Sequence, residues 1–110
     1  MLQKRSRLPS QKFRSRGYQT ASTPYFSLKA RVRDEGGEGG NRIGIVVGMA
    51  VHKSAARRNF WKRQAKAALM DIEDANKDFL VILSPKVNSL SKKQFRKILF
   101  ETAMRLTKLT

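Results

Sequence analysis

Apolar and polar residues follow one another along the chain in patterns that predict strands and helices. Strict alternation over residues 25–33 predicts a strand buried on one face, and residues 42–51 repeat the pattern. Residues 78–83 form a continuous apolar run, which is typical of a strand covered on both faces. Helical spacing of apolar residues predicts helices over 55–75 and from about residue 92 to the C-terminus.

Capping residues indicate where the predicted helices begin and end. Ser10 can cap a short helix over 11–16 that ends at Gly17, and Ser54 can cap the long helix. Ser91 and Gln94 have the spacing of a capping box. Residues 17–24 are expected to form a loop.

The element order is helix, strand, strand, helix, strand, helix, which predicts an α+β fold with one small sheet covered mainly on one face by helices. The strands before and after the long helix are expected to be parallel.

The two alternating strands have one apolar face each. In the first strand, even positions from Phe26 to Val32 face the core, and the outer face carries Tyr25, Ser27, Lys29, Arg31 and Arg33. A basic face with one aromatic suits RNA, although a solvated face is the simpler alternative. In the second strand, Ile43, Ile45, Val47 and Met49 share a face opposite Gly44 and Gly48, and these glycines indicate either a close approach of another group or a bulge.

Charge narrows the choice of partner. The 110 residues include 24 Lys and Arg against 8 Asp and Glu, a formal net charge of +16. This charge repels itself in the folded chain, and a nucleic acid would relieve the repulsion. The cations are spread over several elements, which argues against a membrane-surface helix, and no apolar run approaches the ~20 residues of a membrane span. The absence of cysteine and of a signal-peptide pattern favours the cytoplasm.

The long helix concentrates this charge. On a helical wheel, Trp61, Ala65, Ala68 and Ile72 form an apolar face for the sheet. An adjoining arc of roughly 140° carries cations and an amide suited to phosphates. Its members are Arg58, Asn59, Lys62, Arg63 and Lys66. The alternative is a solvated basic face, but acids that would compensate it are absent until Asp71.

The sequence offers no independent catalytic centre. His52 is the only histidine and is expected to be structural or solvent-facing. The acids Asp71, Glu73, Asp74 and Asp78 match no standard metal motif, so we expect ordinary surface charges there and no metal or cofactor bound by the protein alone.

Several motifs together resemble the bacterial ribonuclease P protein. Residues 58–63, Arg-Asn-Phe-Trp-Lys-Arg, resemble that family's Arg-Asn-Arg-x-Lys-Arg signature, and Phe60 replaces the usual third residue. Arg7-Leu8, Phe13, residues 26–28, the Arg-Ile-Gly-Ile stretch at 42–45 and the strand at 78–83 also resemble the family, in order. Met49-Ala50 stands where the family usually has two lysines, a loss that Lys53 partly offsets. The 17–24 loop is short, and Tyr18 is the nearest match to a second aromatic of the first helix. Phe60 either packs on the helix flank or stacks on RNA.

The resemblance implies a compact single-domain α/β sandwich over residues 10–110, after a basic tail at 1–9, with a left-handed β-α-β crossover. It implies that the catalytic RNA subunit performs the cleavage and holds Mg²⁺, and that precursor tRNA is the substrate. Residues expected to contact that RNA are Arg57, Arg58, Asn59, Lys62, Arg63 and Lys66. Those expected to line a cleft for the 5′ leader are Phe13, Tyr25, Ser27, Lys29 and Arg31. No membrane or DNA partner is expected. The alternative function is that of a basic ribosomal-type protein with no processing role.

Overall fold

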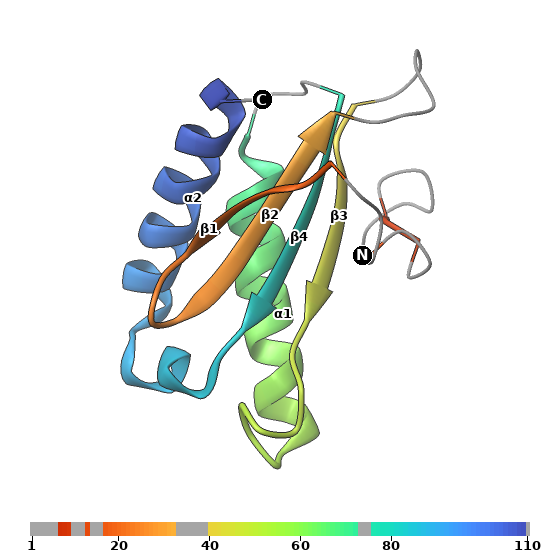
Figure 1. The fold of residues 1–110 in the computed structure, drawn as a ribbon. Coiled ribbons are helices and arrows are strands. Elements are labelled where there is room, and N and C mark those ends of the chain that lie inside the picture. The colour runs from red at the N-terminus through yellow and green to blue at the C-terminus, as the bar shows by residue number, and fades with distance from the viewer. Residues whose placement is uncertain (1–6, 10–12, 14–16, 33–39, 73–75, 110) are drawn as a thin grey trace.

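One mixed sheet with two helices on one face makes up the fold, in a computed structural model that describes residues 7–9, 13, 17–32, 40–72 and 76–109 (Figure 1). The strands lie in the order β1-β2-β4-β3. Their bounds are β1 Gln19–Ser22, β2 Phe26–Val32, β3 Arg42–Val46 and β4 Lys77–Leu83. The helices are α1 Ala55–Met70 and α2 Lys92–Leu109, and a short 3-10 helix, η3 Pro85–Ser89, precedes α2. The α+β prediction is confirmed.

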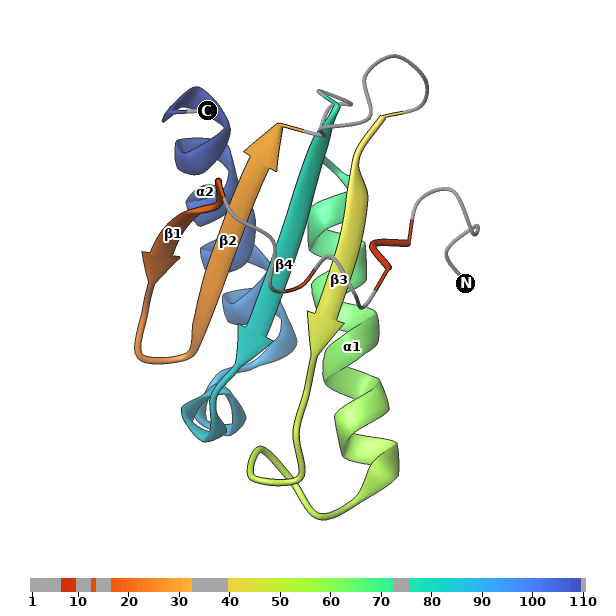
Figure 2. The ribbon, with the colours of Figure 1, turned by 45° about the vertical axis from the view of Figure 1, so that its right-hand side comes forward.

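The connection between β3 and β4 has an unusual hand. These two strands are parallel and adjacent, as predicted, while β2 pairs antiparallel with both β1 and β4. In Figures 1 and 2, β3 and β4 run downward with α1 behind them, and β4 lies to the left of β3. This path is a left-handed crossover, although parallel β-α-β units are right-handed in about 98% of cases. The hand implied by the family resemblance is therefore confirmed.

Both helices bury their predicted apolar faces against the sheet, α1 next to β3 and α2 next to β2 and β1. Trp61, Ala65 and Ala68 of α1 are buried, as are Phe95 and Leu99 of α2. The Trp61 and Phe95 rings meet edge to face with their centroids 5.2 Å apart. The Trp61 indole N–H donates to Oδ1 of Asn88 at 3.0 Å, and the amide of Asn88 donates to the Val51 carbonyl at 2.6 Å. The start of α1, η3 and the loop after β3 are thus fixed together.

The helix caps form as the sequence predicts. The Ser54 hydroxyl accepts from the Arg57 N–H at 3.3 Å. Ser91 and Gln94 form the reciprocal capping box, with bonds of 2.9 and 3.2 Å. However, α1 ends at Met70, before the expected residue 75. Ile72 is still buried because a tight turn, closed by its N–H to the Leu69 carbonyl at 3.2 Å, carries it back to the core.

The predicted loop over 17–24 is wrong, because β1 occupies Gln19–Ser22 and pairs with β2. Gly17 has a φ of 91°, a conformation that suits glycine, immediately before this strand. The Thr23 side chain then closes the hairpin by accepting from the N–H groups of Tyr25 and Phe26, each at 3.1 Å. Because β1 is polar apart from Ala21, it lacks the apolar alternation that reveals a strand. The predicted helix over 11–16, with its Ser10 cap, lies outside the described residues apart from Phe13.

Strand ends differ from the predictions in two further places. Val32 was expected in the core but is 53% exposed at the end of β2. The second strand was expected to reach residue 51, yet β3 ends at Val46 and a turn follows. Met49 is consequently 71% exposed rather than core-facing, and a Cβ at Gly48 would meet nothing within 4 Å. Of the two glycines, only Gly44 marks a close approach.

A buried ion cluster joins the three longest strands. Asp78, the second residue of β4, is fully buried, which corrects the expectation of an ordinary surface charge. Its carboxylate accepts from Nε of Arg42 at 2.7 Å and from Nη2 of Arg42 at 2.9 Å. It also accepts from Nε of Arg31 at 3.2 Å. Because Arg31 and Arg42 both lie opposite Asp78 in the strand register, one carboxylate neutralises much of the charge of two buried guanidinium groups.

Replacing Asp78 with Asn should be among the most destabilising conservative changes in this chain. Asp78→Asn keeps the side-chain shape but removes the carboxylate charge that Arg31 and Arg42 share, and we expect a loss of about 3–5 kcal/mol in the free energy of unfolding. Urea denaturation measures this, with Asp71→Asn at the exposed end of α1 as the matched control. A loss no larger than that of the control would show that the cluster does not stabilise the fold.

Candidate nucleic-acid interface

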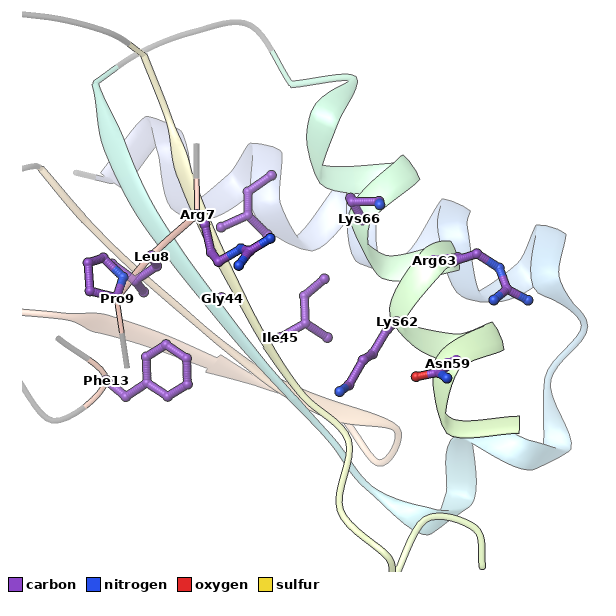
Figure 3. A pocket seen from close by; sticks show the side chains of 11 residues that line it. Arg7, Leu8, Pro9, Phe13, Gly44, Ile45, Asn59, Lys62, Arg63 and Lys66 are labelled. Carbon is purple, nitrogen blue, oxygen red and sulfur yellow. The ribbon is translucent and has the colours of Figure 1, made fainter. Parts of the chain in front are cut away.

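A hollow of about 640 Å³ wraps the free edge of β3 (Figure 3). Strand β3 lies at the edge of the sheet, so the hollow can draw on the N-terminal segment, on the strand and on α1. Apolar groups form the floor and one wall, and cations with one amide form the rest. The lining residues are Arg7, Leu8, Pro9, Phe13, Ile43, Gly44, Ile45, Asn59, Lys62, Arg63 and Lys66. We refer to this site as the edge hollow.

The N-terminal segment is fixed to the strand edge by one backbone contact. Arg7 forms a parallel bridge with Ile43, and the Leu8 N–H donates to the Ile43 carbonyl at 3.0 Å. Leu8 itself is only 2% exposed. This contact brings the Arg7 side chain to the edge hollow, opposite α1 (Figure 3). The sequence indicated a basic entry here but not its pairing with β3.

Gly44 lets the Phe13 ring approach the sheet. A Cβ built at Gly44 would lie 2.7 Å from Cε1 of Phe13 and 3.2 Å from Cδ2 of Leu8, closer than normal contacts. Gly44 pairs with Leu80, which in turn pairs with Lys29, so all three project from the sheet face opposite the helices. Phe13 therefore packs on this open face, and it forms the aromatic wall of the edge hollow.

The α1 wall carries most of the signature residues predicted to bind RNA. Asn59, Lys62, Arg63 and Lys66 all line the edge hollow, and the first three are exposed. Lys62 extends from α1 toward β3 in Figure 3. Within the part of the chain that the structure describes, no acid pairs with these cations, because the ion pairs found there join Arg31 and Arg42 to Asp78. With Arg7 opposite, the edge hollow is a concentrated positive field above an apolar floor.

A model of the Ribonuclease P family matches residues 3–107, nearly the whole chain. The chain belongs to the ribonuclease P family. It is a protein subunit of ribonuclease P and acts in tRNA processing. The alternative of a ribosomal-type structural protein is not favoured. No curated protein sequence matches the chain.

Solved structures of ribonuclease P proteins share the fold. The Staphylococcus aureus RNase P protein is 18% identical, with a TM-score of 0.63 over 84% of this chain and 80% of that one. The Thermotoga maritima RNase P protein is 23% identical, with a TM-score of 0.64 over 83% of each chain. The same protein in complex with 1-(4-fluorophenyl)-2-thiourea is 24% identical, with a TM-score of 0.64 over 77% of this chain and 82% of that one.

Two other cations of this ribonuclease P subunit that were predicted to bind RNA, Arg57 and Arg58, lie outside the edge hollow. Arg58 is half-buried, and its Nη1 donates to the carbonyls of His52 at 2.9 Å and Lys53 at 2.8 Å, which fixes the loop before α1. The Arg57 guanidinium lies 4.5 Å from the centre of the Phe60 ring. Phe60 is half-buried against Trp61, with centroids 5.0 Å apart, so the departure from the family signature packs on the helix flank.

The residues predicted for the leader cleft are only partly brought together. Phe13 lines the edge hollow, whereas Tyr25, Ser27, Lys29 and Arg31 do not. The register does place Ser27, Lys29 and Arg31 on the open face that Phe13 covers at β3. Ser27 and Lys29 are partly exposed there, and Tyr25 is half-buried against the core.

Arg31 differs from these neighbours because it is buried in the Asp78 cluster. Its guanidinium carbon also lies 4.8 Å from the centre of the Tyr18 ring. Burial raises the pKa of Tyr18 above its ordinary value, an effect that the nearby Arg31 charge opposes, so the phenol stays neutral at physiological pH. Arg31 therefore stabilises the sheet. Its charge is less available to a ligand than the charge of the partly exposed Lys29.

Neither a metal site nor a membrane-spanning helix is found among the described residues. No group of three His, Cys, Asp or Glu side chains that could hold a metal ion occurs in the described ranges. No described helix is long and apolar enough to cross a membrane. His52 has a structural contact, since its Nδ1 accepts from the Ser54 N–H at 3.0 Å.

The contact between Phe13 and Gly44 predicts a thermodynamic coupling. Gly44→Ala should cost about 1–3 kcal/mol of unfolding free energy, because the new methyl displaces the ring and Leu8. In a Phe13→Ala background most of this cost should disappear, and denaturant unfolding of the double-mutant cycle measures the coupling. Gly48→Ala, in open space, is the control and should change stability little. Equal costs of Gly44→Ala in both backgrounds would show that the ring does not need the glycine.

Proposed function

We propose that the chain binds the RNA subunit of ribonuclease P through the edge hollow and α1, and helps to hold the 5′ leader of precursor tRNA. The observation that carries this proposal is the charge of the hollow. Arg7, Lys62, Arg63 and Lys66 converge on one concave surface, without an acid among its lining residues. Membership of the ribonuclease P family supports the identity of the RNA.

The geometry suits a phosphate backbone. Arg offers a planar fork that can bind phosphate through two hydrogen bonds, and Lys offers a mobile point charge. Neutralising phosphates releases condensed counter-ions, which drives binding without reading the base sequence. Asn59 adds an amide that can donate to a phosphate or to a base edge. Arg57 and Arg58 remain proposed contacts, although Arg58 has less freedom because it holds the preceding loop.

For the leader, we propose a path from Phe13 across the open face of the sheet. The Phe13 ring offers a surface on which one base can stack, and such stacking contributes ~1–3 kcal/mol per base. Lys29 and Ser27 lie on the same face two strands away, roughly 10 Å from β3 at normal strand spacing. Half-buried Tyr25 lies at the start of β2 and would contact only the far end of such a path. Arg31 is not included, because it is buried and its guanidinium donates to Asp78.

We assign the cleavage chemistry to the RNA subunit. The described side chains supply no acid cluster for Mg²⁺, and the one histidine accepts a backbone hydrogen bond at the start of α1. We therefore propose that Mg²⁺ is bound by the RNA of the holoenzyme and that the protein binds and orients the two RNAs. A cytoplasmic location, without DNA or membrane partners, remains part of this proposal.

Reconstitution with the cognate RNA subunit tests the role of α1. Lys62→Gln with Arg63→Gln should weaken protein binding to that RNA and lower the slope of log affinity against log salt by about two, or about one per cation. Precursor cleavage at low Mg²⁺ should fall in parallel. Binding is measured by filter retention over a salt series.

A second double variant controls for net charge. Arg105→Gln with Lys108→Gln removes the same charge from exposed positions at the far end of α2, and it should alter the slope much less. An unchanged slope in the Lys62/Arg63 variant would remove α1 from the interface. Cleavage of precursor by protein freed of all RNA would overturn the division of labour between protein and RNA.

The leader path is tested by Phe13→Leu, which keeps an apolar side chain but removes the aromatic face. In the holoenzyme, the affinity advantage of leader-bearing precursor over mature tRNA should fall roughly tenfold, in line with the loss of one stacked base. Phe100→Leu makes the same change at a half-buried position on α2 and should leave this advantage intact. An undiminished advantage in Phe13→Leu would exclude Phe13 as a stacking platform.

A further inference from the structure

A second group of cations lies on α2, separate from the edge hollow. Lys92, Lys93, Arg96 and Lys97 occupy the first two turns of this helix, and all are exposed. We call these residues the α2 cation surface. Lys86 of η3, also exposed, shortly precedes it in the chain. None of these residues lines the edge hollow, so the proposed function leaves their charge unused.

Among the described residues, no acid lies in the first two turns of α2. The acids that the structure describes are Asp71 after α1, Asp78 at the start of β4, and Glu101 in the middle of α2. Both helices start toward the same end of the molecule, whereas Asp71 and Asp78 lie toward the opposite end (Figure 1). Described acids therefore cannot neutralise the first turns of the two helices, which together carry Arg57, Arg58, Lys92 and Lys93.

The two helices bring their cations close to each other. Nε of Arg96 donates to Oε1 of Gln64 on α1 at 2.7 Å, so its position is fixed across the seam between the helices. Gln64 follows Arg63, which lines the edge hollow. The Trp61 and Phe95 rings also join the two helices. Trp61 lies about one turn before Gln64 in α1, and the Arg57 guanidinium lies against its ring. Positive charge thus continues from the edge hollow over α1 to the start of α2.

This arrangement costs stability in the free protein. A helix N-terminus carries a partial positive charge, so cations in the first turn are unfavourable and acids are favourable, by about 0.3–1 kcal/mol each. In α2 the first turn has no acid and begins with two lysines. A polyanion placed against Lys92 and Lys93 would neutralise them and offset this cost.

We propose that the α2 cation surface binds the phosphate backbone of the RNA subunit at a second place, distinct from the segment in the edge hollow. The inference rests on the proposed function for the identity of the RNA. A convex helical face with flexible lysines and no exposed aromatic suits the backbone of folded RNA, because single strands need rings for stacking. The protein then clamps two segments of one folded RNA from two adjoining faces.

The test compares three double variants in the full-length protein with the cognate RNA subunit. Lys92→Gln with Lys93→Gln probes the α2 cation surface, Lys62→Gln with Arg63→Gln probes the edge hollow, and Arg105→Gln with Lys108→Gln controls for net charge. Glutamine suits helices about as well as lysine, so all three should fold. The Lys92/Lys93 variant should bind roughly tenfold more weakly near physiological salt, and its salt slope should fall by about two.

Thermal melting separates RNA contact from a structural role. Removing cations from the first turn should raise the melting temperature of the free protein slightly while RNA binding weakens, whereas structural damage would lower both. If the Lys92/Lys93 variant matches the Arg105/Lys108 control while the Lys62/Arg63 variant is impaired, the second contact is refuted and the proposed function stands. If the Lys92/Lys93 variant weakens binding to precursor tRNA but not to the RNA subunit, the assignment to the RNA subunit is refuted. If neither the Lys92/Lys93 nor the Lys62/Arg63 variant is impaired, the proposed function also fails.

Discussion

The hydrogen-bonded cluster of Asp78 with Arg31 and Arg42 is the interaction on which the rest of the structure depends. A chain with a formal charge of +16 must fold against its own repulsion, and here the sheet also encloses two guanidinium groups. One fully buried carboxylate in β4 accepts hydrogen bonds from both and connects β2 to β3 across the sheet. Because Asp78 is buried in the sheet, it does not pair with the surface cations, and their charge remains available to an external anion.

The crossover then decides where those cations lie. β3 remains at the edge of the sheet because the chain passes through α1 and returns as β4 on the inner side of β3. The free edge of β3 can therefore receive the N-terminal segment at Ile43, while α1 faces the same edge from the helical layer (Figure 2). The edge hollow is a product of topology. Residues far apart in the sequence, from Arg7 to Lys66, meet there only because no other strand of the sheet covers that side of β3.

The periodicity of apolar residues predicted the helices and strands that bury an apolar face in the core. Both long helices and the buried faces of Trp61 and Phe95 follow from helical spacing, and the serine caps follow from residue type at the helix starts. The apolar run of β4 follows from burial on both faces. β1 escaped prediction because its polar residues pair through the backbone and leave little apolar signal. Arg31 and Asp78 were assigned to the surface since a sequence does not reveal that two charges neutralise each other across strands. The hand of the crossover came from the family resemblance, because the general rule favours the opposite hand.

Parts of the binding surface were predictable for a different reason. The helical wheel placed Asn59, Lys62, Arg63 and Lys66 on one arc, and all line one hollow. The wheel could not show that Arg58 would turn back to the loop carbonyls, or that Arg7 would stand opposite α1. The residues predicted to line the leader cleft are not all close together. Alternation along a strand predicts which face of the sheet a residue lies on, but the distance between strands depends on strand order. Here β4 lies between β2 and β3 and separates their residues.

Folding and binding make opposite demands on the same charges. Added salt screens the repulsion among unpaired cations and so favours the free fold, but it also removes the counter-ion release that drives RNA binding. Cations at helix starts sharpen this conflict, because α1 and α2 both lack an acid in their first turn. The buried Asp78 cluster is less exposed to salt than the surface cations and keeps the sheet in register under either condition. A sheet whose buried arginines share one internal carboxylate, beneath a helical surface whose described cations have no acidic partner, is thus a physical solution for a small basic protein that we propose to bind RNA.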